Sequence, residues 1–210
     1  MRIIIVSIAI IMISFNSMAD SQQKVLTNYK VNQVKQYSGA KLYVDRGCVA
    51  CHGDDANTPS QPQYPKLAGQ NKDYTIAQIN DIKDGLRNNG HSIVMRGTVI
   101  VDQNEIDKIA EWLLSLPIDI IEEQLNTDGA KLFQDKSCST CHGIDAKSPN
   151  LSVYPKLAGQ NKIYSLAQMK DIKNGKRNSG NSAAMQGVLY NVTTQDMVII
   201  AKWLESLTEK

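Results

Sequence analysis

The sequence CVACHG at residues 48–53 recurs as CSTCHG at residues 138–143, an offset of 90 positions (138 minus 48). The same offset relates much more of the chain, since YPKLAGQNK at residues 64–72 is repeated without a change at residues 154–162. Repetition at a fixed period indicates two copies of one structural unit. A unit of about 90 residues is a normal size for a small domain, so we predict two tandem domains related by internal duplication.

Hydrophobic periodicity predicts that both units are helical. Asp102 and Glu105 form a capping-box pattern ahead of apolar residues at helical spacing, and Pro117 ends that run. Thr193 begins the equivalent pattern in the second unit. Further helices are expected at residues 39–46, 73–83, 129–136 and 163–173. Because alternating β patterns of any length are absent from the sequence, the predicted fold class is all-α.

The N-terminus predicts an export signal. Arg2 supplies a positive charge, residues 3–15 form a largely apolar run, and Ser17 and Ala19 provide small residues for cleavage before Asp20. An uncleaved anchor is the alternative, but this run is shorter than the roughly 20 residues that span hydrocarbon as a helix. The predicted organisation is a signal peptide at 1–19, a polar extension at 20–37, a first domain at 38–117, a linker at 118–127 and a second domain at 128–210.

The cysteine pattern predicts two covalently bound haem c groups. In each C-x-x-C-H motif, two thiols three positions apart can bond to the vinyl groups of one porphyrin, and the adjacent histidine then reaches the iron. The attaching residues are Cys48, Cys51, Cys138 and Cys141, and the iron-ligating histidines are His52 and His142. A redox-active dithiol would need a βαβ context, and a zinc site would need more ligands than His91, the one histidine outside the motifs, can supply.

The second axial ligand of each haem iron is predicted to be methionine. A thioether ligand favours reduced iron, raises the potential and leaves no open coordination position, as an electron carrier requires. Met95 and Met185 each follow the motif histidine of their unit by 43 residues. Both lie in sequence rich in Gly, Asn and Ser, for which we expect loops.

Comparison of the two units separates these methionines from other candidates. Met169 and Met197 stand where the first unit has isoleucine, an exchange that core packing permits, so we predict that both are buried. His91 is a rival iron ligand in the first unit, but its counterpart is Asn181, so we predict an exposed loop histidine. A dihaem peroxidase would need an open iron site, which two methionine ligands would close.

Pro65 and Pro155 are candidates to orient the ligating histidines. Such a histidine usually donates its second ring N–H to a carbonyl group, and these prolines lie at equivalent places after the two motifs. Alternatively, each proline only turns the chain. The residues alone leave both interpretations open.

Together these features resemble class I cytochromes c, and the mature chain as a whole resembles the dihaem cytochrome c4 family. The resemblance is carried by the two C-x-x-C-H-G motifs, the two YPKLAGQ segments, the K-x-G-x-R patterns at residues 83–87 and 173–177, and the M-x-G patterns that begin at Met95 and Met185. It implies that the Pro65 and Pro155 carbonyl groups accept from the ligating histidines. It also implies haem contacts by Leu67 and Leu157.

The resemblance further implies how the helices and domains pack. In each domain the first helix would pack against the last through a glycine and an aromatic residue. These residues are Gly39 and Tyr43 opposite Trp112, and Gly129 and Phe133 opposite Trp203. The two domains would pack against each other about a pseudo-twofold axis.

The function implied by the resemblance is electron transfer rather than catalysis. Family members are periplasmic, free or loosely associated with the membrane, and pass electrons from a quinol-oxidising complex towards a terminal oxidase. The alternative is the dihaem electron-accepting subunit of a redox enzyme complex, such as flavocytochrome sulfide dehydrogenase, whose partner is a flavoprotein.

Charge excludes one class of partner and suggests another. The 23 basic and 21 acidic residues give no basic excess, so nucleic-acid binding is not expected. Residues 65–97 carry a net charge of +2, whereas the matching residues 155–187 carry +5. The basic stretch of the second unit is either a docking face for an acidic redox protein or a solvated surface that partners haem propionates.

Overall fold

The computed structural model describes residues 23–24, 39–119 and 121–208. All regular structure in these ranges is helical and no strand occurs in them, which confirms the all-α prediction. The predicted signal peptide at 1–19 lies outside the described residues, as does the predicted extension at 20–37 except for residues 23–24. Within the described part of the chain, no helix is both long and apolar enough to cross a membrane.

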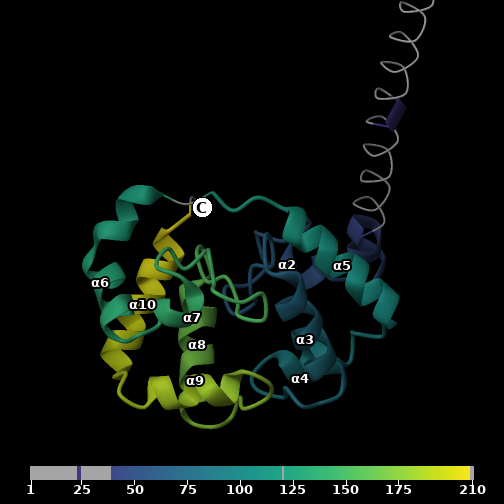
Figure 1. Cartoon of the computed structure of the whole chain (residues 1–210). Coiled ribbons are helices and arrows are strands. Elements are labelled where there is room, and N and C mark those ends of the chain that lie inside the picture. Colours follow the sequence, from purple (N-terminus) through teal and green to yellow (C-terminus); the bar gives the residue numbers. More distant parts are fainter. Residues whose placement is uncertain (1–22, 25–38, 120, 209–210) are drawn as a thin grey trace, which may run out of the picture.

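The helices form two halves that follow one another along the chain, here called domain 1 and domain 2 (Figure 1). Domain 1 contains helical residues 39–45, α2 (Val49–His52), α3 (Lys72–Lys83), α4 (Ser92–Arg96) and α5 (Gln103–Ser115). Domain 2 contains α6 (Asp128–Asp135), α7 (Ser139–His142), α8 (Lys162–Lys173), α9 (Ser182–Leu189) and α10 (Thr194–Ser206). The helices expected from the sequence are all present, with ends that differ by one residue.

The last helix of each domain begins with the capping box that the sequence predicts. The Asp102 carboxylate accepts from the Glu105 backbone N–H over 2.9 Å, and the Glu105 carboxylate accepts from the Asp102 N–H over 3.2 Å. Thr193 and Asp196 make the same pair of bonds at the start of α10. Each box satisfies two backbone donors that the first helical turn leaves without partners. The start of α5 and of α10 is therefore fixed by local sequence.

The first helix of each domain crosses the last one at a glycine. The rings of Tyr43 and Trp112 are 4.8 Å apart in domain 1, and those of Phe133 and Trp203 are 4.9 Å apart in domain 2. A β-carbon built on Gly129 would lie only 2.4 Å from the Trp203 Cβ. Glycine at this position lets the two helices approach until the tilted aromatic rings are in contact, as the family resemblance implied.

We expect Gly129→Ala to destabilise domain 2. The added methyl group overlaps the Trp203 Cβ, and overpacking of this kind costs about 1–3 kcal/mol of unfolding free energy. Denaturant unfolding of the holoprotein measures the loss. Gln134→Ala, at an exposed position of the same helix α6, is the matched control. An unfolding midpoint equal to that of the native protein for Gly129→Ala would contradict the close approach.

The predicted linker at 118–127 contains a 3₁₀ helix, η1 (Glu122–Asn126), that packs on domain 2. The Trp203 indole N–H donates to the Gln124 carbonyl oxygen over 2.8 Å, and the Ile121 N–H donates to the Leu207 carbonyl oxygen over 2.7 Å. Leu125 packs against the apolar core of domain 2. Ile121, Gln124 and Leu125 therefore pack on domain 2, whereas Ile118, at the start of the predicted linker, lies close to Gly69 of domain 1.

The two domains contact each other through reciprocal hydrogen bonds. Arg87 donates to the Tyr164 hydroxyl of domain 2 over 3.0 Å, and Arg177 donates to the Tyr74 hydroxyl of domain 1 over 3.1 Å. Both guanidinium groups also donate to Gln78 Oε1, over 2.9 and 2.8 Å. Each arginine is only 7% exposed. Such exchange of equivalent contacts is what a pseudo-twofold relation between the domains produces.

Candidate functional site

Each C-x-x-C-H motif forms one turn of helix that ends at a glycine. In domain 1 the turn is α2, in which the His52 N–H donates to the Cys48 carbonyl oxygen over 3.0 Å. Gly53 then adopts a φ of 80°, and a β-carbon there would lie 2.2 Å from the Thr58 carbonyl oxygen. Only glycine fits this left-handed, crowded position. The chain therefore reverses directly after the histidine, and α7 of domain 2 ends in the same way at Gly143.

The motif histidines are buried and held by backbone carbonyl groups. His52 Nδ1 lies 2.9 Å from the Pro65 oxygen, and His142 Nδ1 lies 3.0 Å from the Pro155 oxygen. Because a carbonyl oxygen can only accept, each Nδ1 carries the proton and each Nε2 keeps its lone pair. Burial lowers the pKa of both imidazoles, which favours this neutral form. Each ring is therefore prepared to bind a metal through Nε2.

A second loop fixes the position of each proline carbonyl. Ala56 is fully buried with a φ of 56°, and its carbonyl oxygen accepts from the Leu67 and Ala68 N–H groups over 2.7 and 3.0 Å. Ala146 holds Leu157 by an equivalent bond of 2.7 Å. Residues that follow the proline are thereby tied to the loop that follows the histidine. The local backbone, not only the proline ring, sets the histidine contact.

The four cysteines are partly buried, and no disulfide joins them. Burial raises the pKa of Cys48 and of Cys138 to about 11 in each case. A redox-active dithiol needs a thiol whose pKa is lowered, so the environment opposes that interpretation. Among the described residues, no three His, Cys, Asp or Glu side chains gather as a zinc site requires.

Met95 and Met185 lie in short helices, so the expectation that they lie in loops is wrong. The Gly, Asn and Ser residues that suggested loops precede each helix and end in turns at Gly90 and Gly180, with φ of 53° and 52°. The following residues have ordinary helix-compatible side chains and form α4 and α9. Each methionine is therefore held on a short helix, α4 or α9, that precedes the last helix of its domain.

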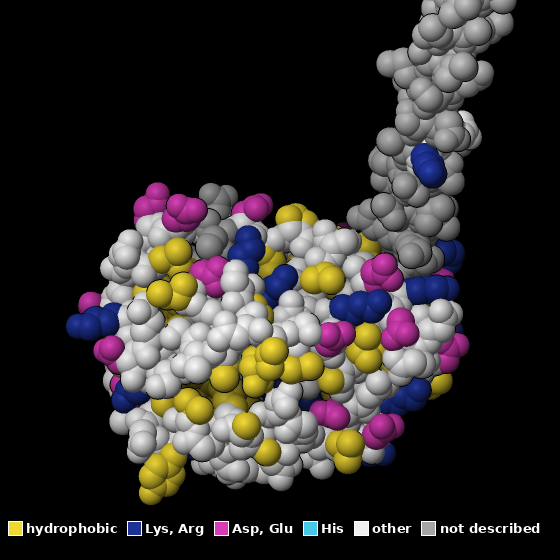
Figure 2. Space-filling model, in the orientation of Figure 1, with side chains coloured by type: hydrophobic (Ala, Val, Ile, Leu, Met, Phe, Trp, Pro, Cys, Tyr) yellow, Lys and Arg dark blue, Asp and Glu magenta, His cyan; other side chains and the backbone are white. Residues whose placement is uncertain are grey.

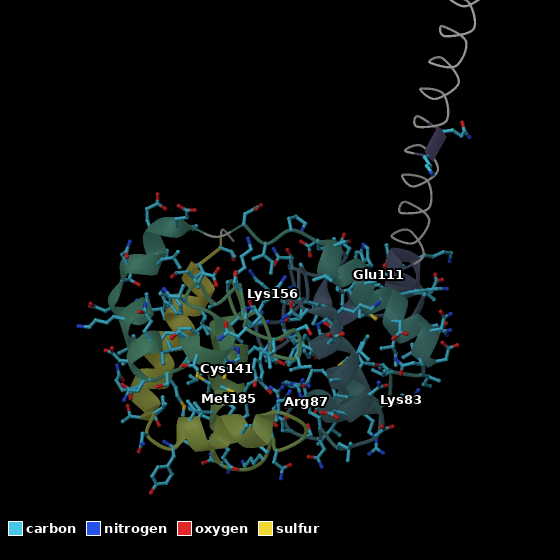
Figure 3. All side chains as sticks on the ribbon, in the orientation of Figure 1. Lys83, Arg87, Glu111, Cys141, Lys156 and Met185 are labelled. Atoms are coloured by element: carbon cyan, nitrogen blue, oxygen red, sulfur yellow. The ribbon has the colours of Figure 1, made fainter. Side chains whose placement is uncertain are left out.

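Apolar side chains surround the space between motif and methionine. In domain 2, the partly buried Cys138, Leu157 and Met185 all pack against one core cluster. Figure 3 labels Cys141 and Met185 in the same part of the view, where Figure 2 shows apolar side chains in a recess of the surface. This set of residues fits a haem, because it combines two thiols, an imidazole Nε2, a thioether and an apolar wall.

Domain 1 places the equivalent residues on two separate clusters. Cys48 and Leu67 pack against the cluster that contains Tyr43 and Trp112. Met95 packs against a second cluster, which contains Ile79, Val101 and Ile106. The motif and the methionine of domain 1 thus pack against two different apolar clusters, and both contribute apolar surface for a haem.

The other candidate ligands lie where the repeat comparison predicts. Met169 and Met197 are 7% and 1% exposed and belong to the core of domain 2, so the prediction that they are packing residues is confirmed. His91 is exposed, and its ring meets the ring of Tyr64 edge-on with centroids 5.4 Å apart.

Sequence reasoning missed the burial of the two arginines in the K-x-G-x-R patterns. Arg87 and Arg177 were counted among the charges of a solvent-facing surface, but both lie in the domain interface, where Figure 3 labels Arg87. Burial alone would raise the pKa of Tyr164, yet the two guanidinium groups hold it below its usual value. The recurrence of the arginine in both units indicated a structural role, but it did not show which contact the arginine makes.

Comparison with known proteins agrees with these features. A family model described as Cytochrome c matches twice, at residues 37–117 and 127–208. Cytochrome c4 of Pseudomonas aeruginosa is 32% identical over 172 residues, which cover 76% of this chain and 83% of that protein. The crystal structure of reduced recombinant cytochrome c4 from Pseudomonas stutzeri matches with a TM-score of 0.66 and 28% identity, covering 81% of this chain and 97% of that one.

A relative with a different name is also similar over most of its length. A thiosulfate dehydrogenase electron acceptor of Stutzerimonas stutzeri is 24% identical over 197 residues, which cover 85% of this chain and 90% of that protein. The two family-model matches and the two C-x-x-C-H motifs indicate a protein with two covalently bound haem c groups that transfers electrons. The cytochrome c model matches both domains, and the cytochromes c4 of two species are similar to the chain over most of their length. The chain therefore belongs to the dihaem cytochrome c4 family.

Proposed function

We propose that each haem iron is bound by one histidine and one methionine, so that the protein carries electrons and does not bind substrate at iron. The axial ligands are His52 and Met95 in domain 1, and His142 and Met185 in domain 2. Pro65 and Pro155 orient the histidines, and Leu67 and Leu157 contact the haems. When bound, a haem with two protein ligands supplies reversible one-electron chemistry.

The observation that carries this proposal is the state of the two histidines. Both rings are buried, neutral, and bonded through Nδ1 to a backbone carbonyl, which leaves Nε2 as the only metal-binding atom. A thioether on a short helix completes each site. Apolar walls around the sites exclude water, which lowers the reorganisation that electron transfer requires.

The physiological route that we propose runs from a quinol-oxidising complex to a terminal oxidase in the periplasm. An export signal at 1–19, cleaved before Asp20, places the protein there, free or loosely associated with the membrane. The cofactors are attached by Cys48, Cys51, Cys138 and Cys141. Isolated membranes that contain both complexes provide the test, because added holoprotein should become reduced by quinol and reoxidised only while the oxidase is active.

The partner face is proposed to lie on domain 2. Exposed Lys83 and Arg96 are accompanied by exposed Asp73 and Asp84 in domain 1. In the matching stretch of domain 2, Lys170 and Lys176 are exposed and no acidic residue is. The difference in charge between the two stretches thus remains when the buried arginines are left out of the charge count. An acidic redox partner would approach this face faster at low salt.

Charge reversal tests the partner face. We expect Lys170→Glu with Lys176→Glu to slow electron transfer to the acceptor several-fold at low ionic strength, and to weaken the dependence of the rate on salt. Stopped-flow reduction of the acceptor measures both effects. Lys131→Glu with Lys202→Glu, at exposed positions of α6 and α10, is the control with equal charge change. If the electron-transfer rate of the native protein did not depend on ionic strength, the docking role would be contradicted.

A second candidate function is supported by the thiosulfate dehydrogenase electron acceptor. That relative matches 85% of this chain, so a role as the electron-accepting partner of a sulfur-compound dehydrogenase is the alternative. A flavoprotein partner, as in flavocytochrome sulfide dehydrogenase, belongs to the same class. Co-purification with such a dehydrogenase, and reduction of the haems by its substrate, would favour this function over the oxidase route.

A further inference from the structure

One peptide group in domain 1 lies between the ligating histidine and a glutamine of domain 2. This group joins Pro65 to Lys66. Its carbonyl oxygen is 2.9 Å from His52 Nδ1, and its N–H donates to Gln160 Oε1 over 2.9 Å. Gln160 is 8% exposed. A continuous chain of hydrogen bonds therefore runs from a side chain of one domain, through a single peptide group, to the imidazole of the other.

The orientation of this glutamine is fixed by what it contacts. Gln160 Nε2 donates to the Lys66 carbonyl oxygen over 2.9 Å, while Oε1 accepts from the N–H groups of Lys66 and of Asn161. Exchange of the amide oxygen and nitrogen would leave all three partners without a complementary group. Gln160 therefore presents an acceptor, and not a donor, to the peptide that holds His52.

The second domain has the same arrangement with the roles exchanged. The peptide group between Pro155 and Lys156 contacts His142 Nδ1 through its carbonyl oxygen at 3.0 Å. Its N–H donates to Gln70 Oε1 of domain 1 over 2.8 Å, and Gln70 Nε2 donates to the Lys156 carbonyl oxygen over 2.9 Å. Each domain thus supplies the glutamine that completes the histidine contact of the other.

Hydrogen bonds that pass through one amide group reinforce each other. When the N–H of a peptide donates to an acceptor, electron density moves towards its carbonyl oxygen, which becomes the better acceptor. A stronger acceptor at Nδ1 makes a metal-bound imidazole more electron-rich. An electron-rich ligand stabilises ferric iron and lowers the reduction potential. Two hydrogen bonds and one peptide group thus connect the glutamine to the imidazole, whose electron density affects the reduction potential of the haem.

We propose that Gln160 and Gln70 are positioning residues that tune, across the domain interface, the potential of the haem in the opposite domain. The inference rests on the proposed ligand roles of His52 and His142. Domain packing and redox tuning then become one property, because a change in the contact between the domains alters both histidine contacts. A partner that moves the domains apart on binding would shift both potentials.

An interface that only joins the domains would behave differently. In that case any loss of a cross-domain bond would loosen both domains equally and would not single out one haem. Asn161 provides the comparison, because its side-chain N–H donates to the Tyr64 carbonyl oxygen over 2.8 Å. This bond crosses the same part of the interface, but the Tyr64 carbonyl group is not part of the peptide that contacts His52.

The test compares three variants of the full-length holoprotein. We expect Gln160→Leu to raise the reduction potential of the domain 1 haem, and Gln70→Leu to raise that of the domain 2 haem. Asn161→Ala should leave both potentials within the error of the measurement. Spectroelectrochemical titration resolves the two potentials. The NMR signal of each histidine Nδ1 proton gives a second readout, because its position and its exchange rate report the strength of the hydrogen bond to the proline carbonyl group.

Gln160→Glu separates tuning from disruption. A carboxylate or carboxylic acid at this position keeps an oxygen acceptor for the Lys66 N–H, so the potential should stay or fall rather than rise. An equal rise in Gln160→Glu and Gln160→Leu would overturn the inference, as would no shift in either leucine variant. The proposed ligands would be contradicted instead by a native protein without the weak red absorption band of sulfur bound to ferric haem. A native protein with fewer than two covalent haems would contradict them as well.

Discussion

A chain with both Cys138→Ala and Cys141→Ala should carry one covalently bound haem instead of two. The thiols of Cys138 and Cys141 account for all the cysteine bonds available to the second haem, because the chain has four cysteines and the other two lie in domain 1. Without attachment, the apolar wall of Leu157 and Met185 loses the group that it surrounds. We therefore expect the haem-to-protein ratio to halve and domain 2 to lose stability.

Denaturing gels stained for haem, together with a haem assay per mole of protein, measure this loss. The matched variant, with Cys48→Ala and Cys51→Ala, should lose the other haem and retain the spectrum of domain 2. Because the domains share the reciprocal contacts of Arg87 and Arg177, each variant should also unfold more readily than the native chain. Two covalent haems in either double variant would show that the cysteines do not attach them.

The fold followed from local signals in the sequence. The repeat predicted two domains. The capping boxes at Asp102 and Thr193 predicted the start of the last helices, because each box depends only on residues within one helical turn. Gly129 opposite Trp203 could be placed only through the family resemblance. Spacing alone does not show which two helices meet.

The domain interface could not be predicted from the sequence pattern. Gln70, Gln160 and the two arginines are polar residues that periodicity assigns to solvent, and they are buried because each finds its partners on the other domain. When the hydrogen-bond partner of a residue lies about 90 positions away in the sequence, the local sequence pattern does not indicate that the residue is buried. The unchanged repetition of YPKLAGQNK was the available signal, since proline and leucine explain only part of that segment.

The helices that carry Met95 and Met185 were missed for a related reason. Gly, Asn and Ser residues precede both helices and dominate the composition of the region, so a window across it predicts a loop. The structure separates a turn that ends at Gly90 from a helix that begins at Ser92, whose hydroxyl donates to the Asn89 carbonyl oxygen over 2.6 Å. Window averages do not resolve a boundary of this kind.

Met185→His should lower the potential of the domain 2 haem by about 0.1 V or more. Exchange of a thioether for an imidazole removes the ligand that favours ferrous iron, and axial ligands set haem potentials over a range of roughly 0.8 V. The red absorption band of sulfur bound to ferric haem should lose the contribution of that domain. Titration of the holoprotein measures the potential, and absorption spectra of the oxidised protein measure the band.

Met95→Ala makes the same test in domain 1 and decides between Met95 and His91. If Met95 is the ligand, the variant loses the band of one domain, and cyanide binds to the open iron. His91 lies beside Tyr64 and is exposed, whereas Met95 packs against the cluster of Ile79, Val101 and Ile106, so we expect this result. His91→Asn, which copies the residue of domain 2, should leave both spectrum and potential unchanged. The opposite pattern, with an unchanged spectrum in Met95→Ala and a shifted one in His91→Asn, would identify His91 as the ligand and make the two iron sites chemically different.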